Sequence, residues 1–324
     1  MKEINIALIG VGAHALKTVI PAINNCDGLK LVALVTSKKI NCLDKSLAHL
    51  AIYESIADLL NDNLVDASYI SSPVDAHYQQ CKLLIEGGVH VLCEKKMCVD
   101  YKKTEELFLL AEKKGVLLQE ALAYIHHPQF KKIKRCIKSI GKNNLQFVNA
   151  KFTVPSFDDD NIRYIPKLGG GALNDVAIYP LSLLFSLFNE SFKEQSSIVI
   201  YDKEKGIDIK GSFTCRVDGV IFSAQWAFDS SYTNCVEFVF HDHQLIVDRS
   251  FSKPLTYNTP IVKKDTIGNI EYINYQKADQ FELMLKYFVN SIIEPTGFKE
   301  QLNIKKISLS VAQLLKEINH VACY

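Results

Sequence analysis

Apolar residues in the N-terminal part of the chain occur in short runs separated by segments with helical spacing. The apolar runs predict strands, and the segments between them predict amphipathic helices. Strands and helices that alternate in this way are typical of right-handed β-α-β units, in which helices cover both faces of a parallel sheet. The predicted strands are residues 4–9, 31–35, 67–71, 89–93 and 116–118, and the predicted helices are 15–24, 55–60, 75–86 and 102–114.

Local signals refine these boundaries. Pro21 lies inside the first predicted helix and should bend it or shift its boundary. Asp75, which follows Pro73, is expected to be the N-cap of the helix it begins. Gly87 and Gly88 should end that helix before the next strand.

After about residue 121 the pattern changes to long segments of alternating polar and apolar residues. Strands without helices between them favour an antiparallel sheet that is open on one face and covered by helices on the other. The predicted strands are 145–154, 197–201, 207–217, 220–228 and 235–240, and the predicted helices are 129–140, 171–188, 276–293 and 298–319. We therefore predict an α/β fold with a doubly wound parallel sheet of the Rossmann type in residues 1–122. Residues 123–324 are predicted to form an α/β domain on a mostly antiparallel open sheet.

Composition narrows the class of protein. The net charge is +1, and the sequence has no stripe of basic residues that would indicate a nucleic-acid partner. The most apolar stretch, residues 181–188, is far shorter than the roughly 20 residues that span a membrane. The chain opens on a predicted strand rather than a targeting peptide, and its nine cysteines are scattered. We expect a cytoplasmic protein that does not bind membranes.

One short segment has the appearance of a metal site. His241, Asp242 and His243 are common metal ligands, but a turn between two strands explains them at least as well. We therefore predict no metal.

The loop after the first predicted strand has the spacing of a dinucleotide-binding turn. Gly10 allows a tight turn, Gly12 lets the backbone approach a pyrophosphate, and Ala15 is small enough to pack between helix and sheet. The N-terminus of the following helix offers N–H groups and a positive dipole end to phosphates. We predict that this loop binds a dinucleotide and that Ala13 and His14 take part.

The ends of two later strands carry polar residues at the edge where a doubly wound sheet binds its ligands. Ser72 and Pro73 end one strand, and His77 lies one turn into the next helix; a plain strand exit would explain these residues equally well. Glu94 and Lys95 end the next strand. A carboxylate there suits a ribose, and a compact cation suits the charge on a reacting oxygen, although lysines in such places are usually only solvated.

A run of three glycines, 169–171, precedes another predicted helix. Asp175 and Tyr179 are four residues apart and are expected on one face of that helix. A phenol beside an aspartate and near a lysine can relay a proton; the alternative is an amphipathic helix whose tyrosine belongs to the core. Arg163, upstream of the glycines, and Asn174 are candidate substrate contacts.

Together these segments resemble the glucose–fructose oxidoreductase/inositol dehydrogenase (Gfo/Idh/MocA) family along nearly the whole chain. The resemblance implies a Rossmann domain followed by an α/β domain whose open sheet often mediates oligomerisation. It also implies that Lys95 is the catalytic lysine of the family's Glu-Lys-Pro motif. The motifs that carry it are the glycine loop, Ser72-Pro73 with His77, Gly88-Val89-His90-Val91-Leu92-Cys93-Glu94-Lys95, His127-Pro128-Gln129, and Gly169-Gly170-Gly171-Ala172-Leu173 followed by Asp175.

The chain departs from the family pattern at two positions. Lys96 stands where the motif has proline, which leaves open whether the usual cis peptide bond is kept. Many members have histidine where this chain has Tyr179. The tyrosine version looks like the branch that contains glucose–fructose oxidoreductase, dimeric dihydrodiol dehydrogenase and the sugar-nucleotide ketoreductases of deoxysugar pathways. The segment 127–129 is similar to the last of these.

The second predicted strand bears on the choice of cofactor. A site that prefers NAD places Asp or Glu near the end of this strand. Here Thr36, Ser37, Lys38 and Lys39 follow, and no carboxylate occurs until Asp44. A hydroxyl and two cations suit a 2′-phosphate, so we predict a preference for NADP(H), with NAD(H) possible; a solvated loop is the alternative.

We therefore predict an NADP(H)-dependent oxidoreductase that transfers hydride between nicotinamide and a small carbohydrate, either a keto-sugar or a sugar nucleotide. Tyr179 would exchange the hydroxyl proton, Lys95 would stabilise charge on the oxygen, and Asp175 would orient the substrate or tune Lys95. Which of Lys95 and Tyr179 is the acid stays open. The alternatives are an inositol or dihydrodiol dehydrogenase and a non-catalytic dinucleotide-binding regulator.

The predicted assembly is a homodimer or homotetramer. The predicted substrate contacts are Arg163, Asn174 and Asp175. The predicted cofactor contacts are Gly10, Gly12, Ala13, His14, Ser37, Lys38, Ser72, Pro73, His77, Glu94 and Lys95.

Overall fold

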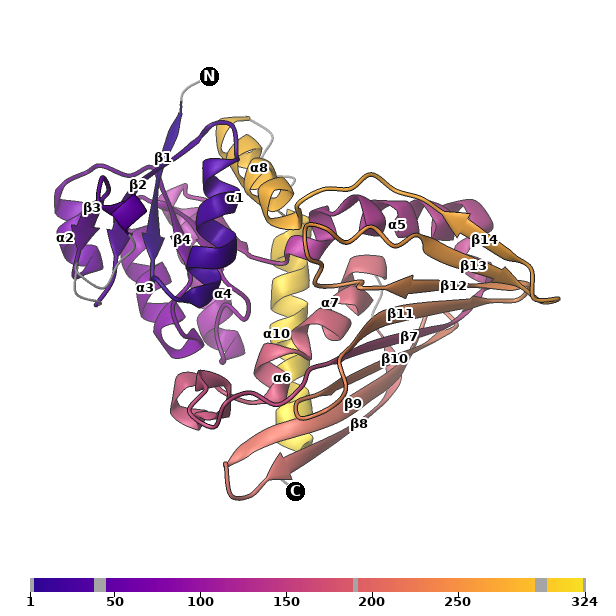
Figure 1. Ribbon diagram of the computed structural model, residues 1–324. Coiled ribbons are helices and arrows are strands. Elements are labelled where there is room, and N and C mark those ends of the chain that lie inside the picture. Colours follow the sequence, from indigo (N-terminus) through magenta and orange to yellow (C-terminus); the bar gives the residue numbers. More distant parts are fainter. Residues whose placement is uncertain (1–2, 38–44, 189–191, 295–301, 323–324) are drawn as a thin grey trace. The chain divides into compact units, whose positions relative to one another are not determined.

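The computed structural model describes residues 3–37, 45–188, 192–294 and 302–322 (Figure 1). Two compact units make up the chain. The first consists of Met1–Leu122 and Phe281–Ala312, and the second of Ala123–Gln280 and Gln313–Tyr324. The long helix α10 (Leu302–Ala322) therefore contributes residues to both units.

The first unit contains a six-stranded parallel sheet in the order β3-β2-β1-β4-β5-β6. The order reverses at β1, and this switch point is where doubly wound sheets bind ligands. The predicted Rossmann sheet is confirmed, apart from β3, which has three half-buried residues and no clear pattern. The strands are β1 (Ile4–Ile9), β2 (Leu29–Val35), β3 (Ala51–Tyr53), β4 (Ala67–Ile70), β5 (His90–Cys93) and β6 (Leu118–Glu120).

Burial explains why most residues of these strands are apolar. All four residues of β4 are buried, as expected for a parallel strand that is covered on both faces. Helices α1 and α2 pack against β2, and α3 packs against β4 and β5. The helices of this unit are α1 (Ile20–Asn24), α2 (Ile56–Asn61), α3 (Val74–Glu86), α4 (Tyr101–Lys114) and α8 (Gln280–Ile293), with part of α10.

One predicted helix cap in this unit is wrong. Helix α3 begins at Val74 with Pro73 in the N-cap position, so Asp75 lies in the first turn and does not cap the helix. The fixed φ angle of proline suits this entry, and the carboxylate still lies near the positive end of the helix dipole. At the predicted first helix, a π-helical segment (Ala15–Val19) precedes α1, and Pro21 lies at the start of α1.

The second unit contains an eight-stranded sheet in the order β14-β13-β12-β11-β7-β10-β9-β8. All neighbours are antiparallel except β7 and β10, which confirms the predicted mostly antiparallel sheet. The strands are β7 (Leu145–Thr153), β8 (Lys193–Asp202), β9 (Ile207–Val217), β10 (Val220–Ala227), β11 (Thr233–Phe240), β12 (His243–Asp248), β13 (Ile261–Asp265) and β14 (Ile270–Ile273). The last three were not predicted, because their polar residues hide the alternation.

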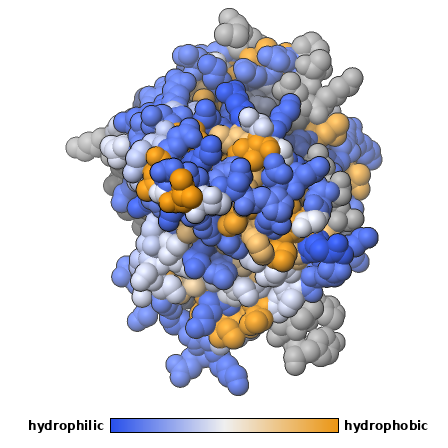
Figure 2. Space-filling model, turned by 90° about the vertical axis from the view of Figure 1, so that its right-hand side faces the viewer, coloured by the Kyte–Doolittle hydropathy of each residue, from blue (hydrophilic) through white to orange (hydrophobic). Residues whose placement is uncertain are grey.

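Within the described residues of this unit, helices cover one face of the sheet and leave the other open. In Figure 1, α6 (Ala172–Asp175) and α7 (Ile178–Leu187) lie on one side of the strands, and both contact β10. Helix α5 (Pro128–Ile140) belongs to the same unit. Figure 2 shows one side of the molecule, where apolar patches lie among hydrophilic side chains. The exposed apolar residues of the open face are Phe147, Ile198, Ile200, Ile221, Ile270 and Tyr272.

The helix predicted over residues 171–188 is two helices. Helix α6 ends at Asp175 and α7 begins at Ile178. Pro180 has no N–H to bond to the carbonyl of Val176, which explains why one continuous helix does not form. Asp175 and Tyr179 therefore lie on different helices, and the expectation that they share a helix face is wrong.

Among the described residues, no single helix is long and apolar enough to cross a membrane. One bent pair of helical segments, Pro166–Asp175 with Ile178–Leu187, has the length and composition of a membrane span, which by itself is weak evidence for one. The cytoplasmic location stays a prediction.

Candidate active site

Gly10 of the glycine loop is required by the protein's own packing. Its φ angle is +86°, and a Cβ atom there would lie 2.8 Å from the backbone nitrogen of Ser72. The Gly10 N–H also donates to the carbonyl of Val35 at 2.9 Å. The loop is thus held against the ends of β2 and β4, as the predicted turn requires.

Gly12 has a different environment. A Cβ atom at this position would meet no described atom within 4 Å, so packing within the described chain does not explain the glycine. The backbone is therefore open to close approach from outside, which fits a dinucleotide phosphate at this turn. Ala15 is fully buried, as expected for the small residue between helix and sheet.

Glu94 follows β5 and connects three elements of the first unit. Its Oε1 accepts a hydrogen bond from the Tyr69 hydroxyl at 2.6 Å and lies 3.0 Å from Nε2 of His14 in the glycine loop. Burial opposes ionisation, but the bonds from His14 and Tyr69 and the charge of Lys95 hold the pKa of Glu94 below its usual value. Glu94 is therefore a carboxylate at neutral pH. Tyr69 escaped the sequence analysis because it lies 25 residues from its partner.

His77 links two strand ends. Its Nε2 lies 2.8 Å from the carbonyl of Ser72, and its Nδ1 lies 3.0 Å from the carbonyl of Lys96. Burial lowers the pKa of His77. Since both ring nitrogens face main-chain carbonyls, this side chain joins the segment after β4 to the segment after β5. The Ser72 hydroxyl bonds to Gln80 on α3.

The peptide bond between Lys95 and Lys96 is cis, although the family's proline is absent. The Lys96 side chain is buried, and its Nζ donates to the carbonyl of Val99 at 3.2 Å. Glu120, also buried, accepts a hydrogen bond from Met97 N at 2.7 Å. Burial raises the pKa of Glu120. Lys96 and Glu120 thus lie beneath the segment that carries Lys95.

The predicted 2′-phosphate contacts are only partly described. Ser37 is an exposed residue after β2. Lys38 and Lys39 lie outside the described residues.

In the second unit, the glycine run carries a charged pair. Arg163 Nε lies 2.7 Å from Asp175 Oδ2. A Cβ atom on Gly170 would lie 2.6 Å from the carbonyl oxygen of Arg163, so only glycine fits this close approach. Asp208, which the sequence analysis missed, is buried and accepts a hydrogen bond from Leu173 N at 2.6 Å, at the start of α6.

Asn174 turns back to the glycine run. Its Nδ2 donates to the carbonyl of Gly170 at 3.2 Å. This predicted substrate contact therefore also supports the backbone that carries Asp175.

Tyr179, near the start of α7, is partly exposed and is surrounded by aromatic rings. The centroid of its ring lies 4.9 Å from that of Phe152, 6.0 Å from that of Phe251 and 6.5 Å from that of Tyr124. The Tyr124 hydroxyl lies 2.8 Å from that of Ser182. Three neighbouring rings restrict the orientation of the phenol, which a proton-exchanging group requires.

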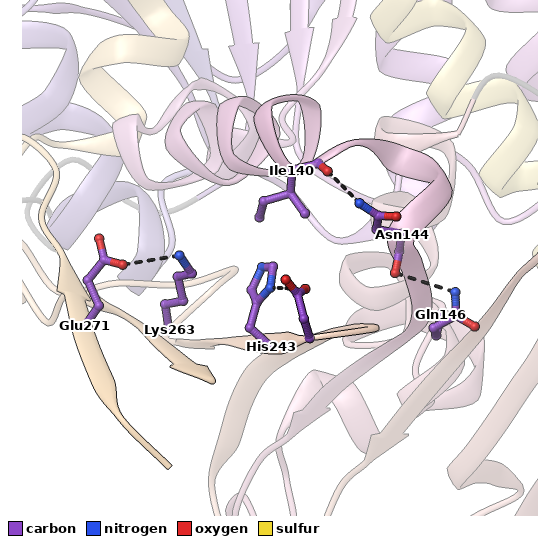
Figure 3. A network of polar contacts seen from close by, with 7 residues as sticks. Ile140, Asn144, Gln146, His243, Lys263 and Glu271 are labelled. Carbon is purple, nitrogen blue, oxygen red and sulfur yellow. Dashed lines mark hydrogen bonds and ion pairs between the residues drawn. The ribbon is translucent and has the colours of Figure 1, made fainter. Parts of the chain in front are cut away.

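In the segment 241–243, His241 and Asp242 form the turn between β11 and β12, and His243 is the first residue of β12 (Figure 3). His243 Nδ1 lies 2.6 Å from Asp242 Oδ1, and its ring stacks on Phe240 with a centroid distance of 4.6 Å. Lys263 and Glu271 form an ion pair nearby. Among the described residues, no group of three histidine, cysteine or acidic side chains could hold a metal.

Two models of one protein family match most of the chain. Residues 4–122 match the oxidoreductase family with an NAD-binding Rossmann fold, and residues 130–246 match the GFO/IDH/MocA C-terminal domain. The chain belongs to the Gfo/Idh/MocA family. As a member of this family it is an oxidoreductase whose Rossmann unit binds a nicotinamide dinucleotide, which confirms the predictions of family and enzyme class.

Several similar proteins are named as reductases of nucleotide-linked sugars, and others as dehydrogenases of D-xylose and scyllo-inositol. The dTDP-3,4-didehydro-2,6-dideoxy-α-D-glucose 3-reductase of Streptomyces violaceoruber is 28% identical over 296 residues, which cover 90% of this Gfo/Idh/MocA protein and 86% of the relative. The reductase of the same name from Actinomadura kijaniata is 27% identical over 242 residues, or 74% and 72% of the two chains. The crystal structure of KijD10, a 3-ketoreductase from A. kijaniata in complex with NADP and TDP-benzene, has a TM-score of 0.88 at 24% identity and covers 98% of both chains. This last likeness shows a shared fold.

Proposed function

We propose that this Gfo/Idh/MocA protein is an NADP(H)-dependent reductase of a keto-sugar, with a sugar nucleotide as the preferred substrate. The observation that carries the proposal is the partly exposed Tyr179, whose ring is held between aromatic neighbours, in a chain that has Lys95 directly after β5 and Glu94. The names of the relatives with 27–28% identity support the substrate class.

The first unit supplies a cation and an oriented carboxylate. Lys95 follows Glu94, whose carboxylate is held by Tyr69 and His14. The ionised Glu94 suits the hydroxyls of a ribose, and the ammonium group of Lys95 suits an oxygen that gains negative charge. When bound, the nicotinamide supplies the hydride.

The second unit supplies the proton and the orientation of the substrate. During reduction the carbonyl carbon gains a hydride and the oxygen gains a proton, which we assign to the Tyr179 hydroxyl; solvent then replaces that proton. Asp175 is fixed by Arg163 at 2.7 Å and can accept hydrogen bonds from sugar hydroxyls. In the oxidative direction the same proton returns to Tyr179.

Turnover by two variants tests the mechanism. Tyr179→Phe and Lys95→Met should each lower kcat about 10²–10⁴-fold, the usual contribution of a positioned proton donor. The matched controls are Tyr101→Phe and Lys113→Met on α4, which should leave kcat unchanged. The proposal is wrong if both active-site variants keep wild-type turnover. The pH profile of kcat for each variant decides which group is the acid, since only loss of the acid removes its limb.

A cofactor titration tests the preference for NADP(H). Ser37 and the absence of a carboxylate before Asp44 favour a 2′-phosphate. Nicotinamide fluorescence should show tighter binding of NADPH than of NADH, and equal affinities would remove this part of the proposal.

The substrate class is tested by a panel. Nucleotide-linked keto-sugars should give a higher kcat/KM than free keto-sugars, and free inositols or cyclic diols should react least. A higher kcat/KM for an uncharged polyol would favour the inositol or dihydrodiol dehydrogenase instead.

We also propose that the open face of the second sheet binds a second copy of the chain. Ile198 and Tyr272 on this face are 60% and 62% exposed, and apolar surface of this kind favours association. Light scattering should give the mass of a dimer or tetramer, and a monomer at micromolar concentration would contradict the proposal.

A further inference from the structure

Arg249 and Tyr257 in the connection between β12 and β13, and Tyr232 just before β11, form a cluster that the reaction proposed above does not use. The guanidinium of Arg249 lies 4.3 Å from the ring centroid of Tyr232 and 5.7 Å from that of Tyr257. Its Nη1 donates to the Tyr232 hydroxyl at 3.0 Å. Arg249 has a φ angle of +49°, a conformation that side-chain-bearing residues adopt at a cost and that often marks functional sites.

Asn234 on β11 holds this cluster in place. Its amide is buried, with Oδ1 accepting from Phe251 N at 2.9 Å and Nδ2 donating to the carbonyl of Ser252 at 2.9 Å. The same Nδ2 lies 3.1 Å from the Tyr232 hydroxyl. The Tyr232 oxygen therefore accepts from both Arg249 and Asn234. Its own O–H can then donate to a further group, so the cluster presents an ordered set of donors.

The carboxylate that neighbours Arg249 in the sequence forms a hydrogen bond elsewhere. Asp248 precedes Arg249, and its carboxylate accepts a hydrogen bond from the Tyr257 hydroxyl. Among the described residues, Arg249 forms no ion pair with a carboxylate. The positive charge of Arg249 could therefore pair with an anionic ligand.

The position of the cluster relative to Tyr179 suits a nucleotide-linked sugar. The ring of Phe152 lies 4.9 Å from that of Tyr179 and 6.3 Å from that of Tyr232, so one aromatic ring separates the proposed proton donor from the Arg249 cluster. In a sugar nucleotide, the reacting carbon and the anomeric carbon that carries the diphosphate likewise lie at different positions of one sugar ring.

We infer that Arg249, with Tyr232, binds the diphosphate of a nucleotide-linked substrate. This inference rests on the proposed function, because it takes Tyr179 as the group that faces the reacting carbon. The guanidinium matches the geometry of phosphate oxygens, and the Tyr232 hydroxyl offers one more donor. Much of the affinity for the substrate would thus come from its diphosphate, which takes no part in the reaction.

The test is calorimetric binding of thymidine diphosphate to the NADPH-bound enzyme. Arg249→Gln should weaken this binding about 10–100-fold, the usual loss for a charge-assisted hydrogen bond to phosphate. Arg249→Lys keeps the charge without the planar fork and should lose less. The control is Arg135→Gln on α5, an exposed residue whose removal should change nothing. Unchanged NADPH affinity shows that each variant is folded.

Two results would overturn the inference. One is equal affinity of the wild type and Arg249→Gln for thymidine diphosphate, and the other is no binding by the wild type. The outcome is separable from that of the proposed function, because the binding measurement needs no turnover. Retained turnover in Tyr179→Phe would refute the proton donor and leave a diphosphate site at Arg249 as a measured fact. With a nucleotide-linked substrate, Arg249→Gln should raise KM and leave kcat nearly unchanged.

Discussion

Lys253 allows a quantitative prediction, because burial lowers its pKa from 10.5 to about 7. Its Nζ donates to the carbonyl of Ser250 at 2.8 Å, and the described residues give it no carboxylate partner. The unfolded chain keeps this proton up to about pH 10.5, whereas the folded chain loses it near pH 7. Between these values the unfolded state binds more protons, so the free energy of unfolding rises with pH.

The size of the effect follows from the two pKa values. From pH 7.5 to pH 9 this group alone should raise the free energy of unfolding by about 2 kcal/mol. Lys253→Met keeps the apolar stem of the side chain and removes the titration. The neighbouring His127 does not interfere, because burial and the charge of Lys253 lower its pKa to about 4 and leave it neutral throughout this range.

The assay is urea unfolding of wild type and Lys253→Met at pH 7.5 and 9. The gain in stability on raising the pH should be about 2 kcal/mol smaller in the variant than in the wild type. Lys264→Met, at an exposed position of β13, serves as the control and should behave as the wild type. If wild type and Lys253→Met gain equally, the amine is solvated and the argument from burial fails.

Three further substitutions test the supports of the candidate site. Gly10→Ala should abolish tight NADPH binding in a fluorescence titration, because its Cβ would collide with the backbone of Ser72; wild-type affinity would show that the loop can shift. Tyr69→Phe removes a hydrogen bond to Glu94 and should weaken NADPH binding by about tenfold in the same titration. An unchanged affinity would show that the orientation of Glu94 does not matter for cofactor binding. Asp208→Asn should lower the free energy of unfolding by about 1 kcal/mol in urea denaturation, because the side chain that accepts the hydrogen bond from Leu173 N at the start of α6 loses its charge.

The sequence predicts best where a single physical requirement dominates a segment. Ile4–Ile9 and Ile207–Val217 have the predicted bounds, the first because a doubly covered strand is almost entirely apolar and the second because its two faces differ. β3 and the strands β12–β14 are too short or too polar for either signal. The break between α6 and α7 depends on a proline four residues after the affected carbonyl, which a pattern of apolar residues does not record.

The site residues follow the same logic. Glycine and charge at strand ends are visible locally, and Gly10 and Glu94 lie at the predicted strand ends. Their partners are not visible, because Tyr69 and Ser72 reach them through the fold. Likewise the fold places the guanidinium of Arg249 over the ring of Tyr232, which lies 17 residues earlier in the chain. Composition alone could not pair these residues.

The parallel pairing of β7 and β10 has a consequence for how the second unit folds. β7 lies between β10 and β11, and both partners are synthesised long after it: Phe147 pairs with Ile221 and with Val239. The β9–β10 hairpin closes through Asp218 and Gly219, both with positive φ, a two-residue turn that forms quickly and locally. We therefore expect this hairpin to be the nucleus onto which β7 docks, so that during synthesis β7, with its one apolar face, stays unpaired until residue 227 has been made.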